Sequence, residues 1–196
     1  MSNIAIFGGT FNPFHIGHYQ MLKYLCSLKF IDKVLVMPDK IPPHKTCEYL
    51  ASDNDRINMC KIAIEDFDKA ELCLIEFDRQ GKSYTADTIK LLKQKYPDDK
   101  FFVSIGADML ATLDKWYNWQ ELLQLTSFIA FKRVGVSDFD SHLARMKNLG
   151  ANIIVAHQNI DYVASSDLRK KLDNKLLPKK VFNYIMDKGI YNDKNL

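Results

Sequence analysis

Residues 8–18 read Gly8-Gly9-Thr10-Phe11-Asn12-Pro13-Phe14-His15-Ile16-Gly17-His18, and this stretch decides the fold. It follows an apolar run at residues 4–7, typical of a buried strand, and precedes an amphipathic stretch at residues 19–28, typical of a helix. A turn from strand to helix offers a phosphate group backbone N–H groups and the positive end of a helix dipole. Its glycines let the backbone approach a ligand closely, and histidines three residues apart can donate to phosphate oxygens together. The stretch predicts a phosphate-binding turn, and a tight turn with two core histidines is the structural alternative.

The rest of the chain alternates strand-like and helix-like segments. Further strands are predicted at 32–37, 71–78, 101–105, 127–131 and 153–155, and further helices at 53–67, 83–96, 119–125, 137–149, 166–172 and 178–188. This alternation predicts an α/β fold, a Rossmann-like doubly wound and mostly parallel sheet with helices on both faces. Ligands of such sheets bind at the carboxyl ends of the strands. We expect one domain over residues 1–196, with a small C-terminal helical region from about residue 165.

The composition bounds the function classes. Of the 196 residues, 47% are hydrophobic, which suits a buried core, and the net charge of +3 is too small to indicate a nucleic-acid or membrane partner. The sequence shows neither a run near the roughly 20 apolar residues of a membrane span nor a signal-peptide layout. The four cysteines, at 26, 47, 60 and 73, lack the spacing of a zinc site or a redox pair. We expect reduced thiols in a cytoplasmic protein, with a homo-oligomer left open.

A loop at residues 38–52 follows the second predicted strand and contains Ile41-Pro42-Pro43-His44-Lys45. Two prolines stiffen the backbone, so His44 and Lys45 would be presented from a fixed loop. A cationic pair beside a phosphate site can neutralise developing charge. A rigid surface loop with solvated charges would have the same sequence pattern. The expected position of this loop beside the first turn favours the functional interpretation.

A second anion-binding candidate follows the last predicted strand. Ser165 or Ser166 is expected to cap the next helix, which places Arg169 in its first turn. The fork-shaped guanidinium of arginine can hold phosphate oxygens bidentately. An ordinary capped helix with a surface arginine is the alternative.

Two further segments follow predicted strands. Gly106 and Asp108 could bind an adenosine ribose or support magnesium, although Asp108 could equally serve as a helix cap. Ser83, as a predicted cap, would begin a helix whose N–H groups near Thr85 face a carboxylate. The indole of Trp116 could stack on a flat heterocycle, or could simply pack in the protein.

Together these motifs resemble known enzymes. The first turn, with its His-x-Gly-His end, and the Ser-Ser-x-x-Arg segment resemble the two signatures of the nucleotidylyltransferase superfamily. Two positions depart from the usual pattern: Asn12 stands for aspartate, and Ala164 for a serine. With Ile-Pro-Pro-His-Lys, Ser-Tyr-Thr-Ala-Asp-Thr, Gly-Ala-Asp and Lys-Trp-Tyr in this order, the chain closely resembles the bacterial nicotinate-nucleotide adenylyltransferase family.

The resemblance implies a reaction and a set of roles. ATP and nicotinate mononucleotide would give deamido-NAD and pyrophosphate, with Mg²⁺ held mainly through ATP phosphates, and no covalent enzyme intermediate would form. The implied catalytic residues are His15, His18, Lys45 and Arg169. ATP binding is implied for Gly8, Gly9, Thr10, Phe11, His15, His18, Gly106, Asp108, Ser165, Ser166 and Arg169, and mononucleotide binding for His44, Lys45, Tyr84, Thr85 and Trp116.

Two alternatives stay open at this point. Phosphopantetheine adenylyltransferase shares the first turn, but its long flexible acceptor would not obviously use the segments around Thr85 and Trp116. A nucleotide-binding sensor without catalysis is the other, and the presence of His15, His18 and Arg169 argues against it.

Overall fold

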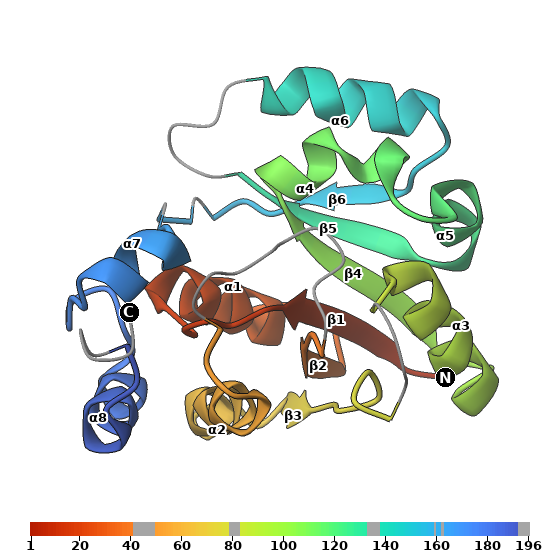
Figure 1. The fold of residues 1–196 in the computed structure, drawn as a ribbon. Coiled ribbons are helices and arrows are strands. Elements are labelled where there is room, and N and C mark those ends of the chain that lie inside the picture. The colour runs from red at the N-terminus through yellow and green to blue at the C-terminus, as the bar shows by residue number, and fades with distance from the viewer. Residues whose placement is uncertain (41–49, 79–82, 133–137, 159, 162, 192–196) are drawn as a thin grey trace.

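A parallel sheet lies at the centre of the molecule (Figure 1). The computed structural model describes residues 1–40, 50–78, 83–132, 138–158, 160–161 and 163–191. Within these residues, six strands pair in parallel in the order β3-β2-β1-β4-β5-β6. Their bounds are Asn3–Gly9 (β1), Lys33–Pro38 (β2), Ala70–Leu72 (β3), Lys100–Gly106 (β4), Ser127–Phe131 (β5) and Ile153–Val155 (β6). The predicted Rossmann-like α/β class is confirmed.

Helices connect the strands and cover both faces of the sheet. Their bounds are Ile16–Ser27 (α1), Asp53–Ile64 (α2), Thr85–Lys95 (α3), Ala107–Ala111 (α4), Trp119–Leu125 (α5), Phe139–Asn148 (α6), Ser165–Lys170 (α7) and Lys179–Lys188 (α8), with a 3₁₀ turn at Leu113–Lys115. Among the described residues, none of these helices has the length and apolar character needed to cross a membrane.

The alternation of side chains along β1 divides the core into two layers. Ala5 and Phe7 pack with α1, α2, α7 and α8 on one face of the sheet. Ile4 and Ile6 point to the opposite face and pack with α3, α4, α5 and α6. All four are buried, as expected for a parallel strand covered on both sides.

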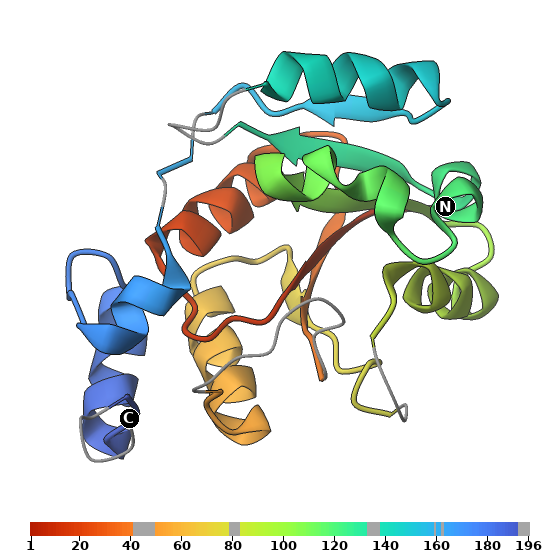
Figure 2. The same cartoon turned by 45° about the horizontal axis from the view of Figure 1, so that its top comes forward.

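The C-terminal helices α7 and α8 lie at one end of the molecule, beyond α1 and α2 (Figures 1 and 2). Leu168 of α7 and Val181 and Ile185 of α8 belong to the same core cluster as β1. On the surface, Lys180 of α8 pairs with Glu65 at 3.1 Å and Asp66 at 3.0 Å. Helices α7 and α8 therefore share a core with the sheet, and the one-domain organisation stays a prediction.

The strand order predicts a ligand site at the carboxyl ends of β1 and β4. The chain moves outward from β1 through β2 to β3, then returns to the other side of β1 at β4. In open α/β sheets, ligands bind where the strand order reverses in this way. Gly8 and Gly9 end β1 there, and Gly106 ends β4.

Several predicted boundaries were wrong. The helix expected from Tyr19 begins at Ile16, because His15 is its N-cap, so the second histidine lies inside the first helical turn. The strand predicted at 71–78 is confined to Ala70–Leu72, since β3 is an edge strand and the chain leaves the sheet in a turn where the Phe77 N–H donates to Leu74 O at 2.8 Å.

The predicted serine and aspartate caps were also wrong. Tyr84, Gly106 and Ala164 occupy the N-cap positions of α3, α4 and α7, and none of them makes a side-chain cap bond. Each of these helices therefore begins one or two residues away from the start that was predicted from a serine or aspartate cap. As a consequence Arg169 lies in the last turn of α7 and not in its first.

The cysteines described by the structure are free thiols: Cys26, Cys60 and Cys73. Burial raises the pKa of Cys26 to about 11 and also raises the pKa values of Cys60 and Cys73. Cys60 is fully buried between α2 and the sheet. Because the thiolate is the reactive form, these thiols are expected to be inert in the folded protein.

We predict that iodoacetamide at pH 8 alkylates Cys60 at least about tenfold more slowly in the native protein than in urea, because the folded thiol is both protonated and shielded. Peptide mass spectrometry over a time course measures Cys60 separately from the other cysteines. Half-buried Cys26 serves as the internal comparison. Equal native and denatured rates for Cys60 would contradict its burial.

Candidate active site

His15 and His18 form a reciprocal cap at the start of α1. The His18 N–H donates to Nδ1 of His15 at 3.3 Å, and the His15 N–H donates to Nδ1 of His18 at 3.2 Å. The two imidazole rings stack, with centroids 3.6 Å apart and an angle of 18° between their planes. The two rings therefore lie face to face, and the helix end itself holds them together; their joint donation to phosphate stays a prediction.

This cap selects the tautomer of both rings. A ring nitrogen that accepts a hydrogen bond carries no proton, so each Nδ1 is the bare nitrogen and each Nε2 carries the hydrogen. Each ring therefore has an Nε2–H donor, and the stack holds both rings at the start of α1, shortly after the end of β1. Donors arranged in this way suit an anion with several oxygens, such as a phosphate chain.

The backbone of α1 contributes less than the sequence suggested. The Ile16 N–H donates to Leu176 O at 2.9 Å, and the His18 N–H is used by the His15 ring. These two amides are therefore engaged within the protein. What the helix start offers an anion is the imidazole pair, together with its dipole.

Aromatic side chains support the imidazole of His18. The Phe11 ring meets it edge-on at 5.0 Å between centroids, and Phe14 lies at 5.4 Å. Phe11 is 1% exposed and stands at φ 49°, so its side chain is part of the core. An ATP contact by Phe11 would therefore have to come from its backbone.

The glycines of the first turn serve different purposes. A Cβ on Gly17 would stand 3.1 Å from Asp161 O and 3.2 Å from Cε1 of His15, so Gly17 is what lets the imidazole pair pack. A Cβ on Gly9 would stand 3.1 Å from Cζ of Phe11. For Gly8 the nearest atom would be Met37 O at 3.9 Å, so packing does not require a glycine there. Close approach of a ligand remains a reason for it.

Arg169 meets the first turn from the other end of the chain. Its Nη1 donates to Asn12 O at 2.9 Å, although the two residues are 157 positions apart. Asn12 is 2% exposed, and its Oδ1 accepts from the Ala51 N–H at 3.1 Å. The two predicted anion-binding motifs are therefore brought together, as the sequence interpretation required.

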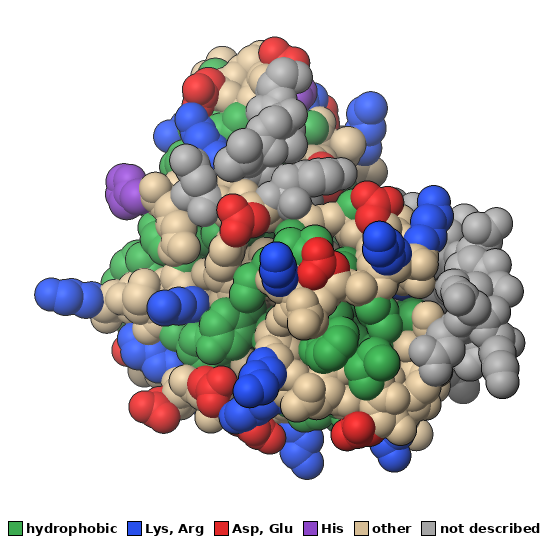
Figure 3. Space-filling view, turned by 90° about the vertical axis from the view of Figure 1, so that its left-hand side faces the viewer, with side chains coloured by type: hydrophobic (Ala, Val, Ile, Leu, Met, Phe, Trp, Pro, Cys, Tyr) green, Lys and Arg blue, Asp and Glu red, His purple; other side chains and the backbone are tan. Residues whose placement is uncertain are grey.

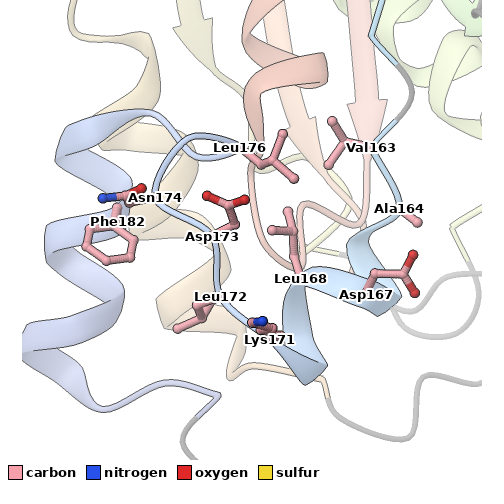
Figure 4. Close-up of a pocket in the computed structure, with 10 residues that line it drawn as sticks. All are labelled: Val163, Ala164, Asp167, Leu168, Lys171, Leu172, Asp173, Asn174, Leu176 and Phe182. Atoms are coloured by element: carbon pink, nitrogen blue, oxygen red, sulfur yellow. The ribbon is translucent and has the colours of Figure 1, made fainter.

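A cavity of about 720 Å³ lies on the opposite face of α7 (Figure 4). Asp167, Leu168 and Lys171 line it, whereas Ser165, Ser166 and Arg169 do not. The helical repeat of 3.6 residues explains this separation, because these two sets point to opposite sides of the helix. Figure 3 shows the end of the molecule that carries α7 and α8, where hydrophobic side chains lie between charged ones. The cavity is therefore separate from the phosphate-binding candidates.

Arg56 is a residue that the sequence interpretation missed. It is fully buried, and its Nη1 donates to Thr10 O at 3.0 Å and Asp39 O at 2.7 Å. Its Nη2 pairs with Asp53 at 2.6 Å. Arg56 thus ties the first turn to the end of β2. A cation at helical spacing from buried Cys60 and Ala63 is the signal that could have identified it.

Two segments that carry acceptor candidates are in contact. The rings of Tyr84 and Tyr117 lie 4.6 Å apart, which joins the start of α3 to the segment after the 3₁₀ turn. Thr85 is the first residue of α3, and Trp116 is half-buried against the second core layer. A helix N-terminus and an indole are therefore held by contacting segments.

The remaining candidates differ in how the structure places them. Gly106 is buried at the end of β4, and Asp108 is exposed in the first turn of α4. His44 and Lys45 lie outside the described residues. Among the residues that the structure does describe, no group of three or more His, Cys, Asp or Glu side chains could hold a metal ion.

Comparisons with known proteins agree with this geometry. Residues 6–177 match the cytidylyltransferase-like family. The chain is 39% identical to the nicotinate-nucleotide adenylyltransferase of Bacillus subtilis, over 97% of this chain and 99% of that protein. It is 38% identical to a probable nicotinate-nucleotide adenylyltransferase of Halalkalibacterium halodurans, over 97% and 92% of the two chains.

Solved structures show the same fold. Plasmodium falciparum nicotinic acid mononucleotide adenylyltransferase, complexed with APC, superposes with a TM-score of 0.79 at 22% identity, over 97% of this chain and 98% of that one. A putative nicotinate-nucleotide adenylyltransferase from Vibrio parahaemolyticus gives 0.69 at 19% identity, over 100% and 98%. With its two candidate anion-binding motifs joined by the contact of Arg169 with Asn12, the chain belongs to the cytidylyltransferase-like family and, within it, to the nicotinate-nucleotide adenylyltransferases.

Proposed function

We propose that His15, His18 and Arg169 bind the triphosphate of ATP while nicotinate mononucleotide lies against Thr85 and Trp116. The reaction moves AMP from ATP to the mononucleotide and gives deamido-NAD and pyrophosphate, a step of NAD synthesis. The observation that carries the proposal is the contact of Arg169 with Asn12, since it gathers a guanidinium and two imidazole donors around one turn. Such a set of donors fits a polyanion.

The chemistry needs alignment and charge stabilisation. A phosphate oxygen of the mononucleotide attacks the α-phosphorus in line, one P–O bond forms, and the bond to the pyrophosphate oxygen breaks. The attacking oxygen is already ionised, so no general base is required. His18, with Nε2 as its donor, would stabilise charge on the transferring phosphoryl group, and Arg169 would hold the departing pyrophosphate.

Residues around this centre complete the ATP site. Gly8 and Gly9 would admit the phosphates, and Thr10 and the Phe11 backbone would line the turn. Ser165 and Ser166 stand on the face of α7 that carries Arg169 and would add hydroxyl donors. Gly106 and Asp108 would face the adenosine from the end of β4 and the first turn of α4.

Magnesium fits this site as an ion held mostly by its substrate. Mg²⁺ keeps several waters and takes few protein ligands, and the described side chains offer donors mainly to phosphate and not to a metal. When bound, the ion would neutralise phosphate charge. Asp108 is the described carboxylate closest in sequence to the end of β4, and it would order the ion's water shell.

The acceptor proposal rests on α3 and its aromatic neighbours. The N–H groups at the start of α3 would receive the nicotinate carboxylate near Thr85, with the positive end of the helix dipole behind them. Trp116 would stack on the pyridine ring. The contact of Tyr84 with Tyr117, the residue after Trp116, would hold the Trp116 segment beside α3. From the loop outside the described residues, His44 and Lys45 would add positive charge at the mononucleotide phosphate.

A pyrophosphate-release assay tests this function. With ATP and magnesium, we expect turnover with nicotinate mononucleotide and far less with nicotinamide mononucleotide or phosphopantetheine. Release with phosphopantetheine alone would favour the other adenylyltransferase. Tight ATP binding without release from any acceptor would favour a sensor. A cytoplasmic place for the reaction and a homo-oligomeric state stay predictions.

Replacing Gly17 by alanine is expected to lower kcat about 10- to 100-fold, because the added methyl group displaces the His15 ring from its stack. The close contacts of the new methyl group with Asp161 O and His15 cost stability. Alanine favours a helix over glycine by about 1 kcal/mol, which offsets this cost, so the thermal midpoint should change little. The same pyrophosphate assay, paired with thermal melting, measures both effects. Wild-type turnover in Gly17→Ala would show that the imidazole pair tolerates displacement.

A further inference from the structure

The described residues after α8 bring Tyr191 to the first turn. Gly189 and Tyr191 both stand in the left-handed region, at φ 64° and 62°. For Gly189 this conformation ends the helix without strain, whereas for a tyrosine it is uncommon. Tyr191 is only 9% exposed and belongs to the core layer that holds β1 and α1.

The hydroxyl of Tyr191 is directed at the phosphate-binding turn. Its Oη donates to Oδ1 of Asn12 at 2.5 Å, across 179 positions of sequence. The same Oδ1 accepts from the Ala51 N–H, and the Asn12 carbonyl accepts from Arg169. Asn12 is therefore the point where three distant segments fasten the turn that carries the two histidines.

We propose that Tyr191 is a positioning residue for adenylyl transfer that acts through Asn12, an inference that rests on the proposed function. Its hydroxyl fixes the Asn12 side chain, and thereby the carbonyl that orients the Arg169 guanidinium. Phenylalanine would fill the same core space, so packing alone does not call for the hydroxyl. A buried hydroxyl is costly to desolvate and repays this only through a well-placed partner.

The proposal also explains how asparagine can stand at position 12, where the superfamily signature usually has aspartate. Asparagine offers the acceptor oxygen that an aspartate would offer, and Tyr191 and Ala51 both use it. The position therefore serves to hold the turn. The negative charge of an aspartate is not needed for these two hydrogen bonds.

The test compares two tyrosine hydroxyls of the C-terminal region. Tyr191→Phe is expected to lower kcat about three- to tenfold, the weight of one hydrogen bond. Tyr184→Phe is the matched control, because its hydroxyl donates to Asp55 at 2.8 Å on α2 and makes no contact with the turn. Both variants should show similar thermal midpoints. Equal kcat in the two variants would overturn the proposal.

Two further measurements exclude a general packing effect. In an Asn12→Ala background, Tyr191→Phe should cause no additional loss of kcat, and an undiminished loss would overturn the proposal. NMR of the histidine side chains should show shifted His15 and His18 signals in Tyr191→Phe and unshifted ones in Tyr184→Phe; unshifted signals in both would contradict it. If the wild-type protein released no pyrophosphate with nicotinate mononucleotide, the proposed function would fail, and these NMR signals would still decide the role of Tyr191.

Discussion

The His18→Ala variant is expected to lose about two to three orders of magnitude in kcat, as enzymes do when one donor to a developing charge is removed. Nε2 of His18 is the proposed donor to the transferring phosphoryl group. The substitution also removes the acceptor for the His15 backbone N–H and the ring that stacks on the first imidazole, although the His18 backbone N–H can still donate to Nδ1 of His15. The effect on KM for ATP should be smaller, because the interaction is strongest in the transition state.

Two variants separate the lost donor from the lost cap. His18→Asn keeps a side-chain oxygen that can accept from the His15 N–H and an amide donor, so it should recover part of the activity and most of the stability. His157→Ala removes an exposed imidazole elsewhere and should leave kcat unchanged. Loss of the cap should cost His18→Ala about 1 kcal/mol in thermal or urea unfolding. A near-normal kcat for a folded His18→Ala would remove this residue from the mechanism.

The sheet could be predicted from sequence because each strand is a short apolar block. The strands at 127–131 and 153–155 and the helix at 119–125 have the predicted bounds. Burial on both faces makes such blocks continuous, and the alternation with helices then dictates parallel pairing. The edge strand β3 was overestimated since it has a partner on one side only.

Helix starts were harder to predict, because the residues that cap them are unusual. His15 caps α1 with a ring nitrogen, and Tyr84, Gly106 and Ala164 occupy cap positions without a side-chain bond. Serine and aspartate rules therefore pointed to neighbouring residues. The tautomers of the imidazole pair follow from the cap, so the sequence could not give them either.

Among the contacts between distant residues at the site, some could be predicted from the sequence and others could not. The meeting of Arg169 with the first turn was predictable, since both follow strands of one parallel sheet. The contacts of Tyr191 and Arg56 with that turn depend on how α8 and α2 pack, which no local pattern specifies. The buried face of α2, which consists of Arg56, Met59, Cys60 and Ala63, depends on the same packing.

Arg56→Ala is therefore the variant expected to damage stability most, by about 3–5 kcal/mol, the range found when a large, fully buried side chain is truncated. Truncation leaves the carbonyl oxygens of Thr10 and Asp39 without this donor and opens a cavity beneath the turn. Urea unfolding measures the loss. Arg56→Lys keeps the charge but cannot reproduce the fork, so it should lie between the alanine variant and wild type.

Lys180→Ala is the control on the neighbouring surface. Its ion pairs with Glu65 and Asp66 are exposed, and such pairs contribute about 0–1 kcal/mol. An Arg56→Ala protein as stable as Lys180→Ala would contradict the role assigned to Arg56. The contrast tests burial and not charge, because both substitutions remove one cation.

The functional consequence of Arg56→Ala should appear in ATP binding. A ligand that binds only the folded state raises stability in proportion to RT ln(1 + [L]/Kd), so the shift of the unfolding midpoint with ATP reports affinity. Because Arg56 holds the Thr10 carbonyl, a loosened turn should weaken ATP binding and shrink that shift relative to wild type. An unchanged shift would mean that the turn keeps its geometry without this brace, and that Arg56 stabilises the fold alone.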